Sequence, residues 1–227
     1  MTLKQRRDEE AALRRQAAAC SLCSSLAETR IQVVFGGGEI DADVMFVGEA
    51  PGATEDRDGV PFAGASGRLL NELLSEIGLS RETVYIANVL KCRPPDNRDP
   101  RREEVANCAH FLERQVELVE PIVLVTLGNY ATKALRGEDG GITAIHGKPE
   151  QRRVGARSLW LLPVFHPAAA LYRRSNLELL KSDFAEIPRL VAEGTPEQPR
   201  SPESAVIEKP PVVQSEPSDE PPQLDLF

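Results

Sequence analysis

Four cysteines have the most distinctive spacing of any residues in this sequence. They form a C-x2-C pair, a gap of 68 residues and a C-x15-C pair, at Cys20, Cys23, Cys92 and Cys108. A C-x2-C pair can reach one metal, and two cysteines from distant segments can complete the ligand set. We therefore predict that all four bind one metal centre. The spacing does not separate zinc from an iron–sulfur cluster, and disulfides or unrelated buried thiols are the alternatives.

Dispersed ligands favour a structural metal site over a reactive one. Radical enzymes take three cysteines from one short loop and leave one iron of the cluster open, whereas this chain offers four ligands from separate segments. Such a centre would stabilise the fold by linking distant parts of the chain. The chemistry of the protein is then expected elsewhere.

A second set of candidate residues follows four short apolar runs, which we predict to be strands. The runs and the residues after them are 43–47 with Gly48-Glu49-Ala50-Pro51-Gly52, 84–87 with Asn88, 122–127 with Gly128, and 159–165 with His166-Pro167. Because ligands bind at the carboxyl ends of parallel strands, these residues are expected to share one site. Ordinary turn chemistry is the alternative, since Gly, Pro and Asn also end strands.

Helical patterns lie before, between and after these strands. They cover residues 1–19, 66–77, 102–119, 129–135 and 177–191, and Pro188 is expected to kink or shorten the last helix. Strands that alternate with helices predict an α/β fold in which a parallel sheet is covered on both faces.

Charge and composition divide the chain in two. Residues 195–227 are rich in Pro, Glu and Ser and carry a net charge of -5, so we predict a disordered tail after a domain at 1–194. The domain itself carries only -3, so a site for DNA would depend on local basic patches. The N-terminus lacks the apolar stretch of a signal peptide and no apolar run could span a bilayer, which predicts a cytoplasmic protein with reduced thiols.

Together, the four cysteines and the strand-end motifs resemble the family 4 uracil-DNA glycosylases, the iron–sulfur members of the uracil-DNA glycosylase superfamily. The resemblance runs from about Cys20 to about Val191. It includes GEAPG at 48–52, GVPFAG at 59–64, NVLKCRPP at 88–95 and HPA at 166–168. It implies a three-layer α/β/α sandwich around a four-stranded parallel sheet, one [4Fe–4S] cluster, and hydrolysis of the N-glycosidic bond of uracil in DNA.

The resemblance also assigns roles in base recognition. A base must be flipped out of a duplex, or met in a single strand, before it can enter a pocket. Phe62 is expected to stack on uracil, and the Asn88 amide can donate to O4 while it accepts from N3–H, a pattern that cytosine reverses. Glu49, with the backbone of Ala50 and Pro51, is expected to lie against the base.

His166 is expected beside uracil O2, where it would stabilise the charge on the departing base. His110 and His146 lack a comparable position at a strand end. The water-activating residue is less defined, because GEAPG has no Asp where better-known relatives carry one. Glu55 matches a carboxylate common in the family, and Asp56 is a second candidate. Solvated loop residues are the alternative for both carboxylates.

Basic side chains near these motifs are candidates for contact with DNA phosphates. The stretch 91–102 has a local charge of +3, and we assign DNA binding to Lys91, Arg93, Arg98 and Arg101 within it and to Arg173 after the His166 loop. Leu171 or Arg173 could fill the space that the flipped base leaves. A solvated surface is the alternative for each residue.

The last five residues form a separate motif. Gln223-Leu224-Asp225-Leu226-Phe227 resembles the peptide by which bacterial proteins bind the replication sliding clamp. Leu224, Leu226 and Phe227 would provide apolar contacts and Gln223 a hydrogen bond, with the acidic linker supplying reach.

The sequence thus predicts a monomeric DNA-repair enzyme that removes uracil and leaves an abasic site. The alternatives are a glycosylase that prefers hypoxanthine or mispaired thymine, and a non-catalytic DNA-binding adaptor. The combination of Phe62, Asn88 and His166 argues against the adaptor.

Overall fold

The computed structural model describes residues 1–137, 140–171 and 173–199. Within these ranges six strands form one mixed sheet in the order β1-β3-β2-β4-β6-β5. The central four are parallel, namely β3 (Tyr85–Asn88), β2 (Val44–Gly48), β4 (Val123–Leu127) and β6 (Arg157–Val164). The short β1 (Gly37–Gly38) and β5 (Glu150–Val154) pair antiparallel at the two edges. The predicted four-stranded parallel sheet is confirmed, with an added strand on each side.

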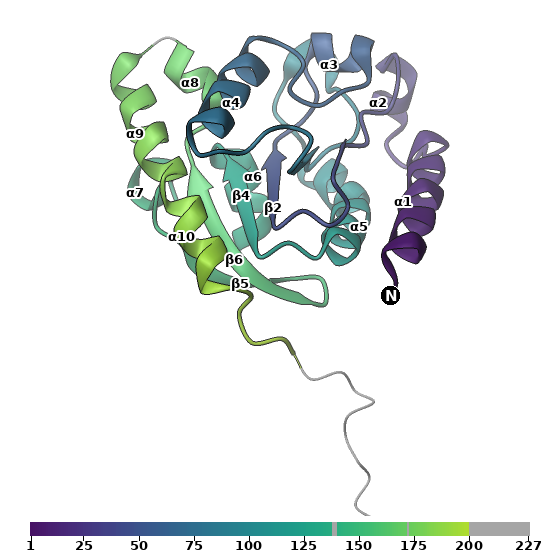
Figure 1. The fold of residues 1–227 in the computed structure, drawn as a ribbon. Coiled ribbons are helices and arrows are strands. Elements are labelled where there is room, and N and C mark those ends of the chain that lie inside the picture. The colour runs from purple at the N-terminus through teal and green to yellow at the C-terminus, as the bar shows by residue number, and fades with distance from the viewer. Residues whose placement is uncertain (138–139, 172, 200–227) are drawn as a thin grey trace, which may run out of the picture.

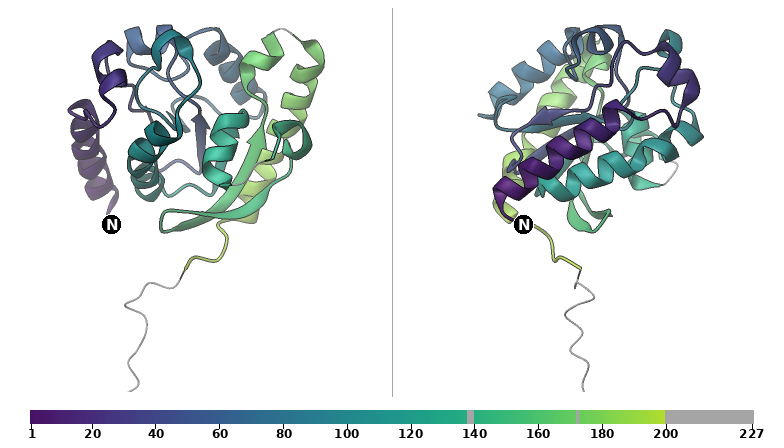
Figure 2. Two further views of the ribbon diagram at one scale, coloured as in Figure 1. Left: turned by 180° about the vertical axis from the view of Figure 1, so that it is seen from behind. Right: turned by 90° about the vertical axis from the view of Figure 1, so that its right-hand side faces the viewer.

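Helices cover both faces of this sheet (Figures 1 and 2). One face packs against α1 (Leu3–Ala18), α5 (Arg102–Val119) and α6 (Asn129–Arg136). The other face packs against α4 (Ala65–Glu76), α8 (Pro167–Leu171), α9 (Arg174–Phe184) and α10 (Glu186–Glu193). Alternate residues of each buried strand enter opposite cores, since Met45 belongs to the first and Phe46 to the second. The predicted three-layer α/β/α sandwich is confirmed.

The long helices agree closely with the apolar periodicity of the sequence. The segment predicted as one helix over 177–191 instead forms α9 and α10, which meet at Ala185. Pro188 is the third residue of α10, where a missing backbone N–H breaks no intrahelical bond. Short elements fill the connections, namely α2 (Ser24–Thr29), α3 (Ala53–Asp58), η1 (Pro95–Asn97) and α7 (Ile142–Ile145).

The chain keeps contact with the sheet beyond α10. Gln198 bonds the backbone of Ser158 twice, because its Oε1 accepts from Ser158 N at 3.1 Å and its Nε2 donates to Ser158 O at 2.8 Å. Residues 200–227 lie outside the described residues, so the predicted tail stays a prediction. In the described part of the chain, no helix has the length and apolarity needed to cross a membrane.

Candidate active site and cysteine site

A pocket opens where the parallel strands end. It is lined by Ala50, Gly52, Glu55, Phe62, Ser66, Asn88 and His166, five of which are predicted site residues. They come from the loop after β2, the start of α3, the turn before α4, the start of α4, the end of β3 and the loop after β6. The fold therefore brings together residues that are up to 116 positions apart in the sequence.

Asn88 is positioned by its neighbouring strand. The residue is 2% exposed, and a Cβ atom on Gly48, its partner in β2, would lie 2.4 Å from Asn88 Oδ1. Only glycine at position 48 leaves room for the amide. Among the described residues no hydrogen bond engages the Asn88 side chain, so both ends of the amide are available to a ligand.

The rings of Phe62 and His166 lie next to each other in the lining of the pocket. Their ring centroids are 5.7 Å apart with an interplanar angle of 27°. The Phe62 ring also lies against the backbone of Gly48, where an added Cβ would come within 2.6 Å of Phe62 Cζ. Phe62 therefore presents a flat apolar surface next to the Asn88 amide, as a planar base requires.

The hydrogen bonding of His166 defines its tautomer. Its Nδ1 accepts from the backbone N–H of Ala168 at 3.1 Å. Burial lowers the pKa of His166 to about 4, although the charge of Glu55 opposes the shift. A neutral imidazole that accepts at Nδ1 carries its proton on Nε2. His166 is thus a neutral donor at physiological pH.

Glu55 and Asp56 have different environments despite being adjacent. Glu55 lines the pocket, and its two carboxylate oxygens accept from Gly52 N at 3.1 Å and Gly64 N at 3.0 Å. Asp56 is 1% exposed and accepts from the backbone of Ile31 and Gln32. Asp56 is absent from the pocket lining, so its candidacy as water activator is wrong because its carboxylate holds a different loop.

The other residues of the first loop differ in what they present. Ala50 lines the pocket, whereas Pro51 is buried. Glu49 is partly exposed, and burial together with the charge of Asp99 raises its pKa to about 7. The backbone O of Glu49 accepts from Leu90 N at 3.0 Å, which joins this loop to the segment after β3.

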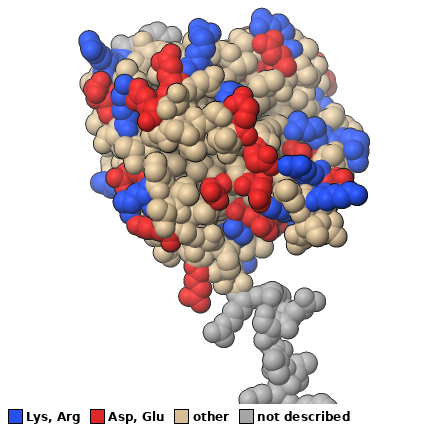
Figure 3. Space-filling view, in the orientation of Figure 1, with Lys and Arg blue, Asp and Glu red and all other residues tan. Residues whose placement is uncertain are grey.

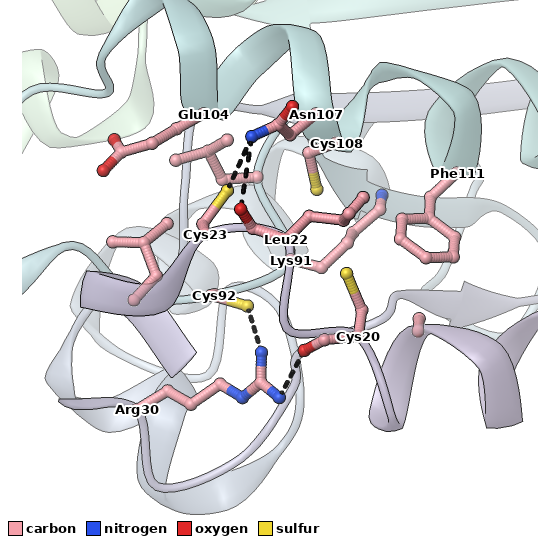
Figure 4. A pocket seen from close by; sticks show the side chains of 13 residues that line it. Cys20, Leu22, Cys23, Arg30, Lys91, Cys92, Glu104, Asn107, Cys108 and Phe111 are labelled. Atoms are coloured by element: carbon pink, nitrogen blue, oxygen red, sulfur yellow. Dashed lines mark hydrogen bonds between the residues drawn. The ribbon is translucent and has the colours of Figure 1, made fainter. Parts of the chain in front are cut away.

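The four cysteines line one cavity beside the pocket. Cys20 and Cys23 come from the turn between α1 and α2, Cys92 follows β3, and Cys108 lies on α5. Figure 4 shows their sulfur atoms around one space, next to Phe111 and the stem of Lys91. Burial raises the pKa of Cys108 to about 11, so the free thiol is protonated at neutral pH.

Two side chains donate hydrogen bonds into the cysteine site (Figure 4). Arg30 Nη1 donates to Cys92 Sγ at 3.0 Å, and its Nη2 donates to Cys20 O at 2.8 Å. Asn107 Nδ2 donates to Cys23 Sγ at 3.6 Å. A thiolate is a much better acceptor than a thiol, so these donors favour the charged form that binds metals.

The four cysteines share one site. Within the ranges that the structure describes, no three His, Cys, Asp or Glu side chains are grouped closely enough to hold a single metal ion. All four cysteines nevertheless border the same cavity. Four sulfur donors around one space are a ligand set typical of metal centres that bind through thiolates.

Lys91 does not have the predicted role in DNA binding. It is 1% exposed, and its Nζ donates to Asn88 O at 2.7 Å and to Gln115 Oε1 at 2.6 Å. A side chain held in this way cannot reach a phosphate. The prediction from local charge was wrong because it assumed that every basic residue of the stretch lies on the surface.

The other predicted DNA-binding residues are at least partly exposed. Arg98 forms an ion pair with Glu104 at 2.5 Å, and the Nε of Arg93 donates to Asn97 Oδ1 at 2.8 Å. Arg101 and Arg173 are exposed, and Leu171 is 45% exposed. Basic and acidic side chains alternate on the face drawn in Figure 3, so no continuous basic surface covers it. DNA contact by these residues stays a prediction, and the clamp-like peptide lies outside the described residues.

Several features of the site were not predicted from the sequence. Ser66 lines the pocket, and the close packing of Gly128 against His166 is also new: Gly128 has a positive φ of 93°, and a Cβ on it would lie 2.9 Å from His166 Cβ. Ser66 lies two residues after the GVPFAG stretch, at the start of a helical pattern, which could have indicated a position at the site. The buried environment of Lys91 has no comparable local signal.

Comparison with known proteins supports one family. The family model described as "Uracil DNA glycosylase superfamily" matches residues 35–188. A type-4 uracil-DNA glycosylase of Archaeoglobus fulgidus is 43% identical over 186 residues, covering 80% of this chain and 93% of the relative. One from Sulfurisphaera tokodaii is 40% identical over 183 residues, covering 78% and 83%. One from Thermotoga maritima is 46% identical over 158 residues, covering 69% and 80%.

Proposed function

Because the chain belongs to the uracil-DNA glycosylase superfamily, we propose that the pocket between Phe62, Asn88 and His166 binds uracil from DNA and catalyses its release. The chain is a uracil-DNA glycosylase, a hydrolase of N-glycosyl bonds that acts in DNA repair. The observation that carries the residue roles is the convergence of a stacking ring, an unengaged amide and a neutral imidazole in one pocket.

Base recognition follows from Asn88. Its Nδ2 donates to uracil O4 while its Oδ1 accepts from N3–H, and Phe62 stacks on the ring. With the amide in this orientation, cytosine would place its amino donor against Nδ2 and its N3 acceptor against Oδ1, so like groups would oppose each other. Unpaired polar groups in a buried pocket carry a penalty of about 1–3 kcal/mol each, enough to reject cytosine.

Bond cleavage follows from His166. When the N1–C1′ bond breaks, its electron pair stays with uracil and negative charge develops on O2. The Nε2–H of neutral His166 donates to that oxygen more strongly in the transition state than in the ground state. Water then adds to C1′ and loses a proton, and the uracil anion gains one, so the products are neutral uracil and an abasic sugar. Glu55 is the carboxylate in the pocket that can orient this water.

Cys20, Cys23, Cys92 and Cys108 would hold one [4Fe–4S] cluster. Four sulfur donors around one apolar cavity, with Arg30 and Asn107 donating to two of them, fit such a group. Bound there, it would supply a cross-link between the N-terminal segment, the loop after β3 and α5. Iron and sulfide analysis of purified protein tests this proposal, and stoichiometric zinc in a colourless protein would contradict it.

One assay tests the function itself. The protein is incubated with oligonucleotides that contain a single uracil, hypoxanthine or mispaired thymine, in single and double strands, and abasic sites are measured. Release from uracil DNA, with little from the others, is expected. Release mainly from hypoxanthine or thymine would contradict the base preference, and binding without release would indicate a DNA-binding adaptor.

A sliding clamp is the proposed protein partner. The support is the sequence Gln223-Leu224-Asp225-Leu226-Phe227 at the end of an acidic segment. Deletion of residues 223–227 should abolish binding to a bacterial clamp in a pull-down assay and leave turnover on short DNA unchanged. If the truncated protein still binds the clamp, the proposed contact is wrong.

A further inference from the structure

The backbone of Phe62 has an unusual conformation. Its φ is 53°, in the left-handed region that bulky side chains rarely adopt. Such a conformation persists only when surrounding contacts impose it, and it often occurs where a side chain must point in a particular direction. Here that side chain is the ring beside Asn88 and His166 in the pocket.

Arg81 supplies the contacts that impose this conformation. Its Nη1 donates to Phe62 O at 3.1 Å and its Nη2 donates to Pro61 O at 2.6 Å. One guanidinium therefore holds the two carbonyl groups on either side of the Phe62 N–Cα unit. On the other side, Gly67 packs so closely that a Cβ there would lie 1.6 Å from Phe62 O.

Arg81 has few polar contacts apart from those with the turn at Pro61 and Phe62. Its side chain is half-buried, and its one other hydrogen bond in the described part of the chain goes to Asn71 Oδ1 at 3.5 Å. No carboxylate lies within ion-pair distance of Arg81 among the described residues. The planar guanidinium can donate to two acceptors at once, which offsets the cost of removing its charge from water. Here both acceptors, Pro61 O and Phe62 O, belong to one turn.

We propose that Arg81 is a positioning residue that fixes the Phe62 ring at the angle needed to stack on uracil. This inference rests on the proposed role of Phe62 in the uracil pocket. Arg81 does not touch the base. It acts by selecting the strained backbone conformation, so that the stacking surface exists before the base arrives and binding does not have to order it.

A matched control exists at the opposite end of the sheet. Arg157 is also half-buried, and it donates to two consecutive carbonyls, Glu120 O at 2.7 Å and Pro121 O at 3.3 Å. Glu120 has a positive φ of 58°, like Phe62. Arg157→Met therefore removes a similar clamp from a similar turn, far from the pocket.

The experiment compares Arg81→Met, Phe62→Leu, the double variant and Arg157→Met. The inhibition constant of free uracil and the KM and kcat for uracil DNA are measured, with thermal unfolding as a check on folding. Arg81→Met should weaken the binding of free uracil about as much as Phe62→Leu does, on the order of tenfold. The double variant should lose little more affinity than either single variant. Arg157→Met should lower thermal stability without changing the uracil constant.

Arg81→Lys provides the rescue test. Lysine keeps the charge and can reach one carbonyl, so this variant should recover part of the affinity for uracil. It also replaces Arg81→Met in the comparison if Arg81→Met does not fold. Wild-type affinity in both Arg81 variants, or losses that add in the double variant, would overturn the proposal. If Phe62→Leu itself leaves uracil binding unchanged, the proposed stacking role fails first. A wild-type protein that releases no uracil would instead contradict the proposed function.

Discussion

The pocket and the cysteine site lie next to each other but are built in opposite ways. The pocket takes its groups from the ends of parallel strands and their loops, and two of them, Glu55 and His166, accept hydrogen bonds from backbone N–H groups. The cysteine site takes Cys20, Cys23 and Cys92 from turns and loops, and Cys108 from the helix α5. The sheet brings the pocket residues together, whereas the cluster that we propose would link the cysteine-bearing segments. The segment 88–92 joins the two regions, because Asn88 lines the pocket and Cys92 lines the cysteine site.

Replacing the leaving-group donor should separate the two regions most clearly. His166→Ala removes the Nε2–H that we propose stabilises charge on O2, so kcat on uracil DNA should fall by roughly 10²–10³, as for other preorganised donors. The iron content and thermal unfolding should stay near those of the wild type. His110→Ala, on the exposed side of α5, serves as the control and should keep the wild-type rate. A His166→Ala protein with normal kcat would remove this residue from the mechanism.

Removing one cysteine should affect iron content and stability most directly. Cys108→Ala should lose the cluster, and the unfolding free energy should fall by roughly 2–4 kcal/mol, the scale of a lost cross-link. That corresponds to a drop in Tm of about 5–15 °C for a domain of this size. Ala106→Ser, exposed on the same helix, is the control. An unchanged Tm after loss of iron would show that the site does not hold the fold together.

Lys91 should connect the two regions. Lys91→Met leaves Asn88 O and Gln115 Oε1 without their buried donor, so unfolding should be easier by about 1–3 kcal/mol. Because we propose that Asn88 reads the base, we expect KM for uracil DNA to rise as well. Urea unfolding and steady-state kinetics measure the two effects. A variant that loses stability but keeps its KM would show that the position of Asn88 does not depend on Lys91.

The smallest expected effect concerns pH. Since the pKa of His166 is about 4, the imidazole stays neutral from pH 5 to 8 and its titration should not change the rate in that range. Glu49, with a pKa of about 7, would otherwise obscure this result, so the profile is measured on Glu49→Gln. A flat kcat is expected. A step near pH 6.5 would indicate that His166 titrates as an exposed imidazole does.

The same two groups have opposite effects on stability. The lowered pKa of His166 means that the unfolded chain binds more protons between about pH 4 and 6.5, so this group makes stability rise with pH there. The raised pKa of Glu49 means that the folded chain binds more protons between about pH 4.5 and 7, so this group makes stability fall. Glu49→Gln should therefore show the steeper rise with pH.

The sequence predicted what depends on local pattern. Apolar alternation and helical periodicity identified the sheet and its covering helices, and strand ends identified Asn88 and His166. Lys91 and Asp56 were misassigned because the sequence gives charge but not burial, and both are enclosed by segments distant in the chain. The clamp of Arg81 on Phe62 depends on a backbone angle and on a contact across 19 residues, neither of which leaves a local pattern.

The hydrogen bonds between Gln198 and Ser158 fix where the chain leaves the domain after α10. Ser158 lies near the start of β6, at the opposite end of the sheet from the pocket (Figure 1). Residue 199, the last that the structure describes before the C-terminal segment, therefore lies next to a backbone contact at that end of the sheet. Asn88 and His166 lie at the other end of the same strands. The point at which residues 200–227 join the domain and the residues that line the pocket are thus separated by the length of the sheet.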